Sequence, residues 1–239
     1  MIKTSSSLPI ASVENTAKFR AALKNGDPHL AVTLLHGPID LDDQDESKAS
    51  LLMVAAYRGY SNICLRLLEL GADPLYGFEE YYPTDNGTDE TEWHSPLTRA
   101  KMSRDLPTID VVERAFVGAQ WRELKKIKDN DPSGFLHFGT ARLDDAARLG
   151  MMDLCLEMVT QGIPVESSDV FDSSPATYAA DSSQLPTCLL LLALGASPEP
   201  LQFCASIPED LLSAFLTVAK HLKTRGPAEN EASPGLAHL

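Results

Sequence analysis

Residues 50–74 carry the clearest pattern of apolar and polar positions in the chain, and this pattern predicts two short helices back to back. Ser50 is a suitable N-cap for the first helix. Gly59 is placed to end it, because glycine readily adopts the left-handed conformation found at helix ends. The apolar positions of the second helix recur at helical spacing: Ile63, Cys64, Leu67 and Leu68. A pair this short cannot bury its own apolar face, so it requires similar pairs on either side.

The same pattern recurs along the chain with a spacing of 33 residues. Gly26 precedes Gly59 by 33 residues, and Gly162 follows Gly150 by the same 12 residues that separate Gly71 from Gly59. Small or apolar pairs stand before these positions: Ala22-Leu23, Ala55-Ala56, Ala146-Ala147 and Ala179-Ala180. Two copies carry another residue in place of the first glycine, namely Arg104 and Ser183. The chain is therefore predicted to be an array of helix pairs.

This pattern resembles the ankyrin repeat, which begins Thr-Pro-Leu-His-x-Ala and has a period of about 33 residues. The segments Ser95-Pro96-Leu97-Thr98 and Ser174-Pro175-Ala176-Thr177 stand in the place of that opening tetrapeptide. The resemblance covers roughly residues 14–222. It implies an all-α fold, an ankyrin-repeat solenoid of stacked helix-turn-helix pairs with projecting hairpin loops.

The repeat register predicts how the chain is divided. Repeats are expected at about residues 14–44, 45–76, 91–128, 137–167 and 170–200, with a C-terminal cap at 201–223 that includes an amphipathic helix. The third repeat is degenerate, and its second helix is longer than the others. We expect one domain over residues 14–223, between a flexible segment at 1–13 and a disordered tail at 224–239.

Residues 77–92 interrupt the period and are interpreted as an insertion. Aromatic side chains are interspersed with acidic ones in and beside it, with Tyr81 and Tyr82 inside it and Trp93 at its border. Two interpretations stay open. The aromatic side chains could contact a partner, or they could fold back to cover the edge of a neighbouring repeat.

The composition narrows the choice of partner. The chain of 239 residues has 34 acidic and 20 basic side chains, a formal charge of −14. This charge argues against nucleic acid or an anionic membrane as the main partner, and it favours a protein with a basic or mixed surface. The alternative is that the acids only keep an elongated monomer in solution. No apolar run is long enough for a membrane span and no signal peptide is evident, so a cytoplasmic or nuclear location is expected.

No motif of an enzyme or a metal site is present. The sequence has no phosphate-binding glycine loop, no His-Glu-x-x-His and no nucleophile elbow. An EF-hand loop that begins at Asp40 would need glycine and glutamate where Asp45 and Leu51 stand. Cys64, Cys155 and Cys188 occupy the same place in three repeats, which is typical of a small core residue. We expect no catalytic residue, no metal and no cofactor.

Candidate binding residues follow from the ankyrin resemblance. In that family, partners are usually held by the hairpin tips and the exposed end of each first helix. We carry these positions over to this chain and add the two tyrosines of the insertion. The predicted partner-binding set is Tyr57, Arg58, Tyr81, Tyr82, Trp93, His94, Phe138, Arg148 and Phe171.

The predicted function is that of a non-catalytic scaffold or adaptor that binds a partner protein through the concave face and the hairpin tips. The alternative is a targeting subunit of an enzyme complex, such as a substrate adaptor of a ubiquitin ligase or a host-directed effector. In that case another chain performs the chemistry.

Overall fold

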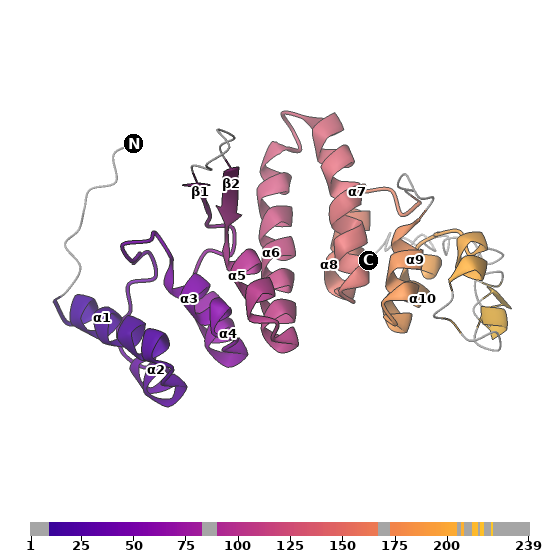
Figure 1. Cartoon of the computed structure of the whole chain (residues 1–239). Coiled ribbons are helices and arrows are strands. Elements are labelled where there is room, and N and C mark those ends of the chain that lie inside the picture. The colour runs from indigo at the N-terminus through magenta and orange to yellow at the C-terminus, as the bar shows by residue number, and fades with distance from the viewer. Residues whose placement is uncertain are drawn as a thin grey trace, which may run out of the picture. The chain divides into compact units, whose positions relative to one another are not determined.

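The computed structural model describes residues 10–82, 90–166 and 173–204, together with 207, 212–214, 216, 217 and 221. The chain divides into two compact units, Met1–Gln120 and Trp121–Leu239, where the sequence predicted one domain. The division falls inside helix α6 (Leu106–Ile127). Each unit is built from helix pairs (Figure 1).

The first unit stacks its helix pairs in layers. The pairs are α1 (Ile10–Asn25) with α2 (Pro28–Leu34), and α3 (Leu51–Tyr57) with α4 (Ser61–Glu69), followed by α5 (Pro96–Ser103) and the first part of α6. Helix α3 packs between α1 and α5, and α2 packs on α4. The shared core contains these buried side chains: Phe19, Leu23, Leu51, Leu52, Ala55, Ala56, Ile63 and Leu67.

The second unit repeats this arrangement. Helix α7 (Pro132–Arg148) pairs with α8 (Met152–Thr160), and α9 (Pro175–Asp181) pairs with α10 (Leu185–Ala193). Helix α7 packs on α9, α8 packs on α10, and the 3-10 helix η1 (Glu199–Phe203) packs on α9. The predicted all-α solenoid of stacked helix pairs is confirmed within each unit.

A left-handed residue ends the first helix of every pair, at the position that the sequence register assigns. Gly26, Gly59 and Gly150 have φ values of 76°, 73° and 70°. Arg104 and Ser183, which replace the glycine, have φ values of 60° and 59°. At Ser183 the conformation is held by a hydrogen bond of 2.9 Å from its N–H to the carbonyl of Ala180. The chain reversal therefore imposes this conformation whether or not glycine is present.

Replacing Ser183 with glycine is expected to stabilise the second unit by about 0.5–1 kcal/mol, because glycine adopts a positive φ without steric penalty. The neighbouring Ser182 has a φ of −89° and is a matched control. Ser182→Gly should lower stability slightly, since it only adds freedom to the unfolded chain. Thermal unfolding of both variants tests this, and equal shifts of the same sign would contradict it.

Side-chain caps fix where several helices begin, as the sequence predicts. Asp27 accepts a hydrogen bond from the Leu30 N–H, with Pro28 in the first turn, and Ser50 accepts one from the Met53 N–H. Ser95 and Ser174 form capping boxes in which the fourth residue of the motif is a threonine. The tetrapeptides that resemble the ankyrin opening therefore act as helix starts.

Helices begin earlier than predicted in two places. Helix α1 starts at Ile10, inside the segment predicted to be flexible. Helix α7 starts at Pro132 after the N-cap Asp131, so Phe138, predicted to lie on a hairpin tip, is helical. That tip is absent because buried residues at helical spacing, Phe135, Gly139, Leu143 and Ala146, continue one apolar face.

The insertion forms an antiparallel hairpin. Strand β1 (Phe78–Tyr82) pairs with β2 (Glu90–His94), with Phe78 opposite His94 and Tyr82 opposite Glu90. Residues 83–89 between the strands lie outside the described part of the chain, as does most of the predicted C-terminal helix.

Candidate functional site

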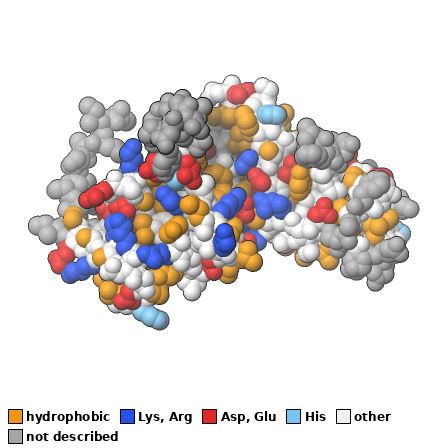
Figure 2. Space-filling view, viewed as in Figure 1, with side chains coloured by type: hydrophobic (Ala, Val, Ile, Leu, Met, Phe, Trp, Pro, Cys, Tyr) orange, Lys and Arg blue, Asp and Glu red, His pale blue; other side chains and the backbone are white. Residues whose placement is uncertain are grey.

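A groove crosses the first helices of the first unit and is the best candidate for a binding site. It has a volume of about 200 Å³. Residues from α1, α3, α5 and the turn before α3 line it: Lys24, Asp45, Ser47, Ala49, Met53, Val54, Tyr57, Arg58 and Arg99. We call it the inner groove. Figure 2 shows Lys and Arg side chains interspersed with hydrophobic ones over α1, α3 and α5.

Tyr57 is the aromatic centre of the inner groove. It stands at the end of α3 and is 51% exposed. The Arg99 guanidinium lies over its ring, 6.0 Å from the centroid. One turn further along α5, the Met102 sulfur is 3.9 Å from Arg99 Nη1 and its side chain is exposed. An aromatic ring, a thioether and a guanidinium are thus available together on one surface.

Arg58 adds a second guanidinium, next to Tyr57 in sequence. It donates a hydrogen bond to the Lys24 carbonyl at the end of α1. The last carbonyls of a helix lack partners within the helix and attract cations, which explains this position. Within the described residues, neither Arg58 nor Arg99 is within ion-pair distance of a carboxylate. Both keep hydrogen-bond donors for another molecule.

Lys24 differs from these two arginines because its charge is already paired. Its Nζ lies 2.8 Å from the carboxylate of Asp45, which is mostly buried. Burial would raise the pKa of Asp45, but hydrogen bonds from Lys24, Ser47 and the Ala49 N–H hold it well below its usual value. The Asp45 carboxylate is therefore an ionised, structural anchor at one end of the inner groove.

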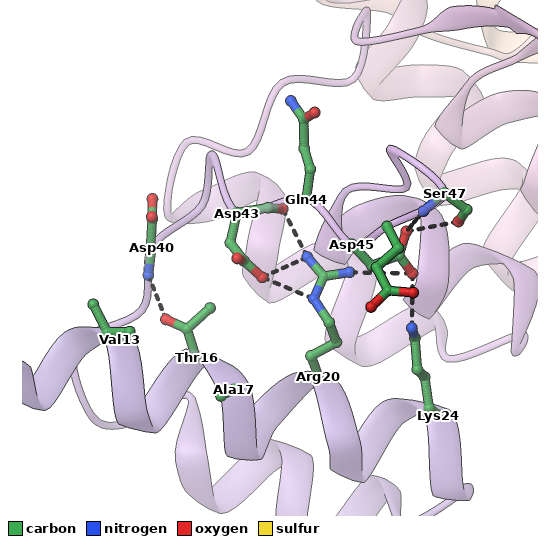
Figure 3. Close-up of a pocket in the computed structure, with 11 residues that line it drawn as sticks. Val13, Thr16, Ala17, Arg20, Lys24, Asp40, Asp43, Gln44, Asp45 and Ser47 are labelled. Atoms are coloured by element: carbon green, nitrogen blue, oxygen red, sulfur yellow. Dashed lines mark hydrogen bonds and ion pairs between the residues drawn. The ribbon is translucent and has the colours of Figure 1, made fainter.

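A larger groove of about 620 Å³ lies beside the inner groove, between α1 and residues 40–47 (Figure 3). Its centre is filled by Arg20, whose Nε and Nη2 donate to Asp43 at 2.8 and 2.5 Å. Arg20 also donates to the carbonyls of Ala49 and Asp43, at 3.0 and 2.8 Å. These ion pairs and hydrogen bonds hold the turn on α1. Within the described residues, no group of three or more His, Cys, Asp or Glu side chains is arranged to hold a metal ion.

Of the predicted residues whose side chains the structure describes, Tyr57 and Arg58 lie together in this groove. His94 was predicted to contact a partner, but it is 2% exposed. It is buried because β2 pairs with β1, which places the Phe78 ring 5.2 Å from the His94 ring. His94 Nε2 lies 3.0 Å from the Glu80 carboxylate. His94 is a core residue of the hairpin base.

Some of the other aromatic residues near the insertion fold back on a neighbouring repeat, and Trp93 is exposed and available to a partner. Tyr76 donates a hydrogen bond of 2.8 Å to the Lys48 carbonyl, and the Lys48 ammonium lies 6.0 Å from the Phe78 ring centroid. These contacts match aromatic side chains that fold back on the preceding turn. Trp93 is 52% exposed and lies against Gly77, where an added Cβ would be 2.5 Å from the indole ring. The side chains of Tyr81 and Tyr82 lie outside the described residues.

The remaining predicted residues belong to the second unit. Phe138 is exposed on α7 and contacts His137 edge-on, with ring centroids 5.2 Å apart. Arg148 ends α7, where its Nη2 is 3.6 Å from Asp145. Ten residues of helix separate Phe138 from Arg148, roughly 15 Å along the axis, so they do not form one compact site. Phe171 lies outside the described residues.

The sequence prediction missed Arg99, which lines the inner groove with Tyr57 and Arg58. The sequence contained a signal for Arg99, because the repeat register places Met102 at the exposed end of the first helix of its repeat. A residue three positions earlier in a helix lies on the same face. Applying helical spacing to that register position would have identified Arg99.

The cysteines are core residues, as predicted for Cys64, Cys155 and Cys188. All three are fully buried, and burial raises the pKa of each thiol to about 12. Cys204 is also buried, with its pKa raised to about 11 chiefly by burial. A thiol with so high a pKa has little thiolate at neutral pH, so none of the four has the character of a nucleophile.

No protein-family model matches the chain, and no curated protein matches it. Among solved structures, the chain is similar to the human ASB11 ankyrin repeat domain, with 17% sequence identity. The match covers 84% of this chain and 82% of that one, with a TM-score of 0.39. Within the described residues, no helix is long and apolar enough to cross a membrane.

Proposed function

We propose that this chain is a non-catalytic protein-binding module of the ankyrin-repeat type, a monomeric scaffold or adaptor that holds a partner protein in the inner groove. The observation that carries the proposal is Tyr57, an exposed aromatic side chain that lines the groove together with two arginines, and these arginines have no carboxylate partner among the described residues. Tyrosine and arginine are enriched among the residues that dominate binding energy at protein interfaces.

The arrangement of the helices supports this proposal. In repeat proteins each unit contacts only its neighbours, so the first helices together form an extended surface for binding. The inner groove is open and built from helices, which hold its side chains in fixed positions. If the chain is instead a targeting subunit of an enzyme complex, the same groove would take the target. The identity of the partner decides between these two functions.

A paired set of variants tests the proposed function. Tyr57→Ala with Arg58→Ala should weaken partner binding by at least about 30-fold, because two central interface residues are removed. The matched control is Leu65→Ala with Arg66→Ala, an exposed apolar residue and an exposed arginine on α4, outside the groove. Both variants should keep the melting temperature near that of the original chain, since the removed side chains are exposed.

The measurement is affinity purification of the tagged chain and both variants from native extract, with quantitative mass spectrometry of the proteins recovered. One stoichiometric partner should be present with the original chain and the α4 variant, and lost with the groove variant. Equal loss with both variants, or no stoichiometric protein partner at all, would contradict the proposed function.

A further inference from the structure

We infer that the ligand of the inner groove is an acidic peptide segment of the partner, with Asp or Glu side chains on both sides of one apolar or aromatic residue. This inference rests on the proposed function and specifies its chemistry. It differs from the partner that the total charge of −14 favours, because the local charge of the groove has the opposite sign.

The local charge follows from the residues that line the inner groove. Three cationic side chains, Lys24, Arg58 and Arg99, face one carboxylate, Asp45. That carboxylate is paired with Lys24 at 2.8 Å. The charges of Arg58 and Arg99 are therefore uncompensated among the described residues. A planar guanidinium can form two parallel hydrogen bonds with one carboxylate, so each arginine can bind one Asp or Glu side chain.

The position of Tyr57 determines which kind of ligand residue lies between the two acidic side chains of the ligand. Arg58 follows Tyr57 at the end of α3, and the Arg99 guanidinium on α5 lies over the Tyr57 ring. Met53 and Val54 line the same groove, and Met102 extends the apolar surface beside Arg99. An apolar side chain seated here would bury surface against the Tyr57 ring and the exposed Met102 thioether, which adapts to varied shapes. The ligand pattern is acidic, apolar, acidic.

The dimensions of the inner groove favour a peptide segment over a small molecule or nucleic acid. A volume of about 200 Å³ is smaller than the roughly 300–1,000 Å³ of drug-sized ligand sites, so it has room for a few side chains. A nucleic acid backbone is commonly bound by about 6–10 cationic contacts, and two uncompensated arginines do not reach that number.

Arg99→Glu is the decisive variant. It reverses the charge over Tyr57, and we expect it to weaken binding of an acidic peptide by at least about 30-fold. Arg99→Met keeps the length of the side chain without its charge and should show a smaller loss. The matched control is Lys101→Glu, the same change of charge on the same helix at an exposed position outside the groove. Circular dichroism confirms that each variant is folded.

The probe is a random dodecapeptide display library, panned against the purified full-length chain. Selected peptides should be enriched in Asp and Glu around an apolar position. Their synthetic forms should bind the original chain and Lys101→Glu alike, lose affinity for Arg99→Glu, and bind more weakly as salt increases. Basic or uncharged consensus sequences, no selected sequence, or full binding to Arg99→Glu would overturn the inference. So would a synthetic duplex DNA that displaces the peptides and binds more tightly.

The two proposals can fail separately. If a stoichiometric protein partner is lost with the Tyr57 and Arg58 variant, but the selected peptides are not acidic, the proposed function stands and the inference fails. If no protein partner is recovered and no peptide is selected, both fail.

Discussion

Replacing Arg20 with alanine is expected to lower the free energy of unfolding of the first unit by about 3 kcal/mol, because it leaves the Asp43 carboxylate without its cation and the Ala49 carbonyl without its donor. Arg20 joins α1 to the turn before α3 through hydrogen bonds to Asp43 and to the Ala49 carbonyl (Figure 3). The carboxylate of Asp45 also lies near Arg20, with its Oδ2 3.7 Å from Nη1. Urea unfolding of Arg20→Ala and the original chain measures the difference.

Lys18→Ala is the control, two residues before Arg20 on the face of α1 that meets solvent. Its ion pair with Glu14 is 2.7 Å long, but both side chains are exposed. Such pairs contribute about 0–1 kcal/mol, so this variant should unfold almost like the original chain. Hydrogen exchange adds a local measurement, because the Lys48 N–H donates to the Asp45 carbonyl and should exchange faster in Arg20→Ala. Equal stability losses in both variants would contradict the role assigned to Arg20.

Trp121→Ala is expected to destabilise the second unit by about 3–5 kcal/mol, since it removes the largest fully buried side chain of that unit. The Trp121 ring packs against Phe135 with centroids 5.5 Å apart, and its Nε1–H donates to Glu157 at 3.0 Å. The cavity left by alanine accounts for most of the loss. Thermal and urea unfolding of the full chain provide the measurement.

Trp121→Phe separates packing from hydrogen bonding at the same position. It keeps an aromatic ring against Phe135 and removes only the hydrogen bond to Glu157, which retains Lys125 at 2.6 Å. The expected loss is about 1–2 kcal/mol, from one hydrogen bond and a smaller ring. A loss as large as that of Trp121→Ala would show that the Glu157 contact, and not the packed ring, holds this region.

The helix pairs could be predicted from sequence because their signals are local and repeated. Apolar spacing, caps such as Ser50 and glycines such as Gly59 recur with one period, so each copy supports the others. Arg104 and Ser183 obey the register without being glycine, since closing hydrogen bonds within each pair impose the left-handed conformation. The repeat pattern therefore predicted backbone conformation better than the residue type at any single position.

The errors arise where structure depends on contacts distant in sequence, or where the family pattern was carried over without a check. His94 is buried by strand pairing across the insertion, which has no periodic signal. Phe138 was placed on a hairpin tip from the repeat register, although Phe135, Gly139 and Leu143 already continue a helical face. Gly139 supports that face directly, because an added Cβ would lie 2.2 Å from Ile163 Cδ1.

The candidate site was predicted only in part, because charge was considered for the whole chain. The total of −14 pointed to a basic partner, whereas the inner groove has two arginines without carboxylate partners among the described residues. Stacking brings Arg58 and Arg99, which are 41 positions apart, onto the same surface as Tyr57. The sign of such a local surface depends on tertiary contacts such as the Lys24–Asp45 pair, which composition does not reveal.

Hydroxyl-radical footprinting of the chain with and without its recovered partner tests the central claim most directly. Met102 beside the inner groove and Met152 on α8 are exposed to similar degrees, 49% and 44%, so they oxidise comparably in the free chain. The partner should protect Met102 and Tyr57 and leave Met152 unprotected. Protection of Met152 with continued oxidation of Met102 and Tyr57 would contradict binding at the inner groove.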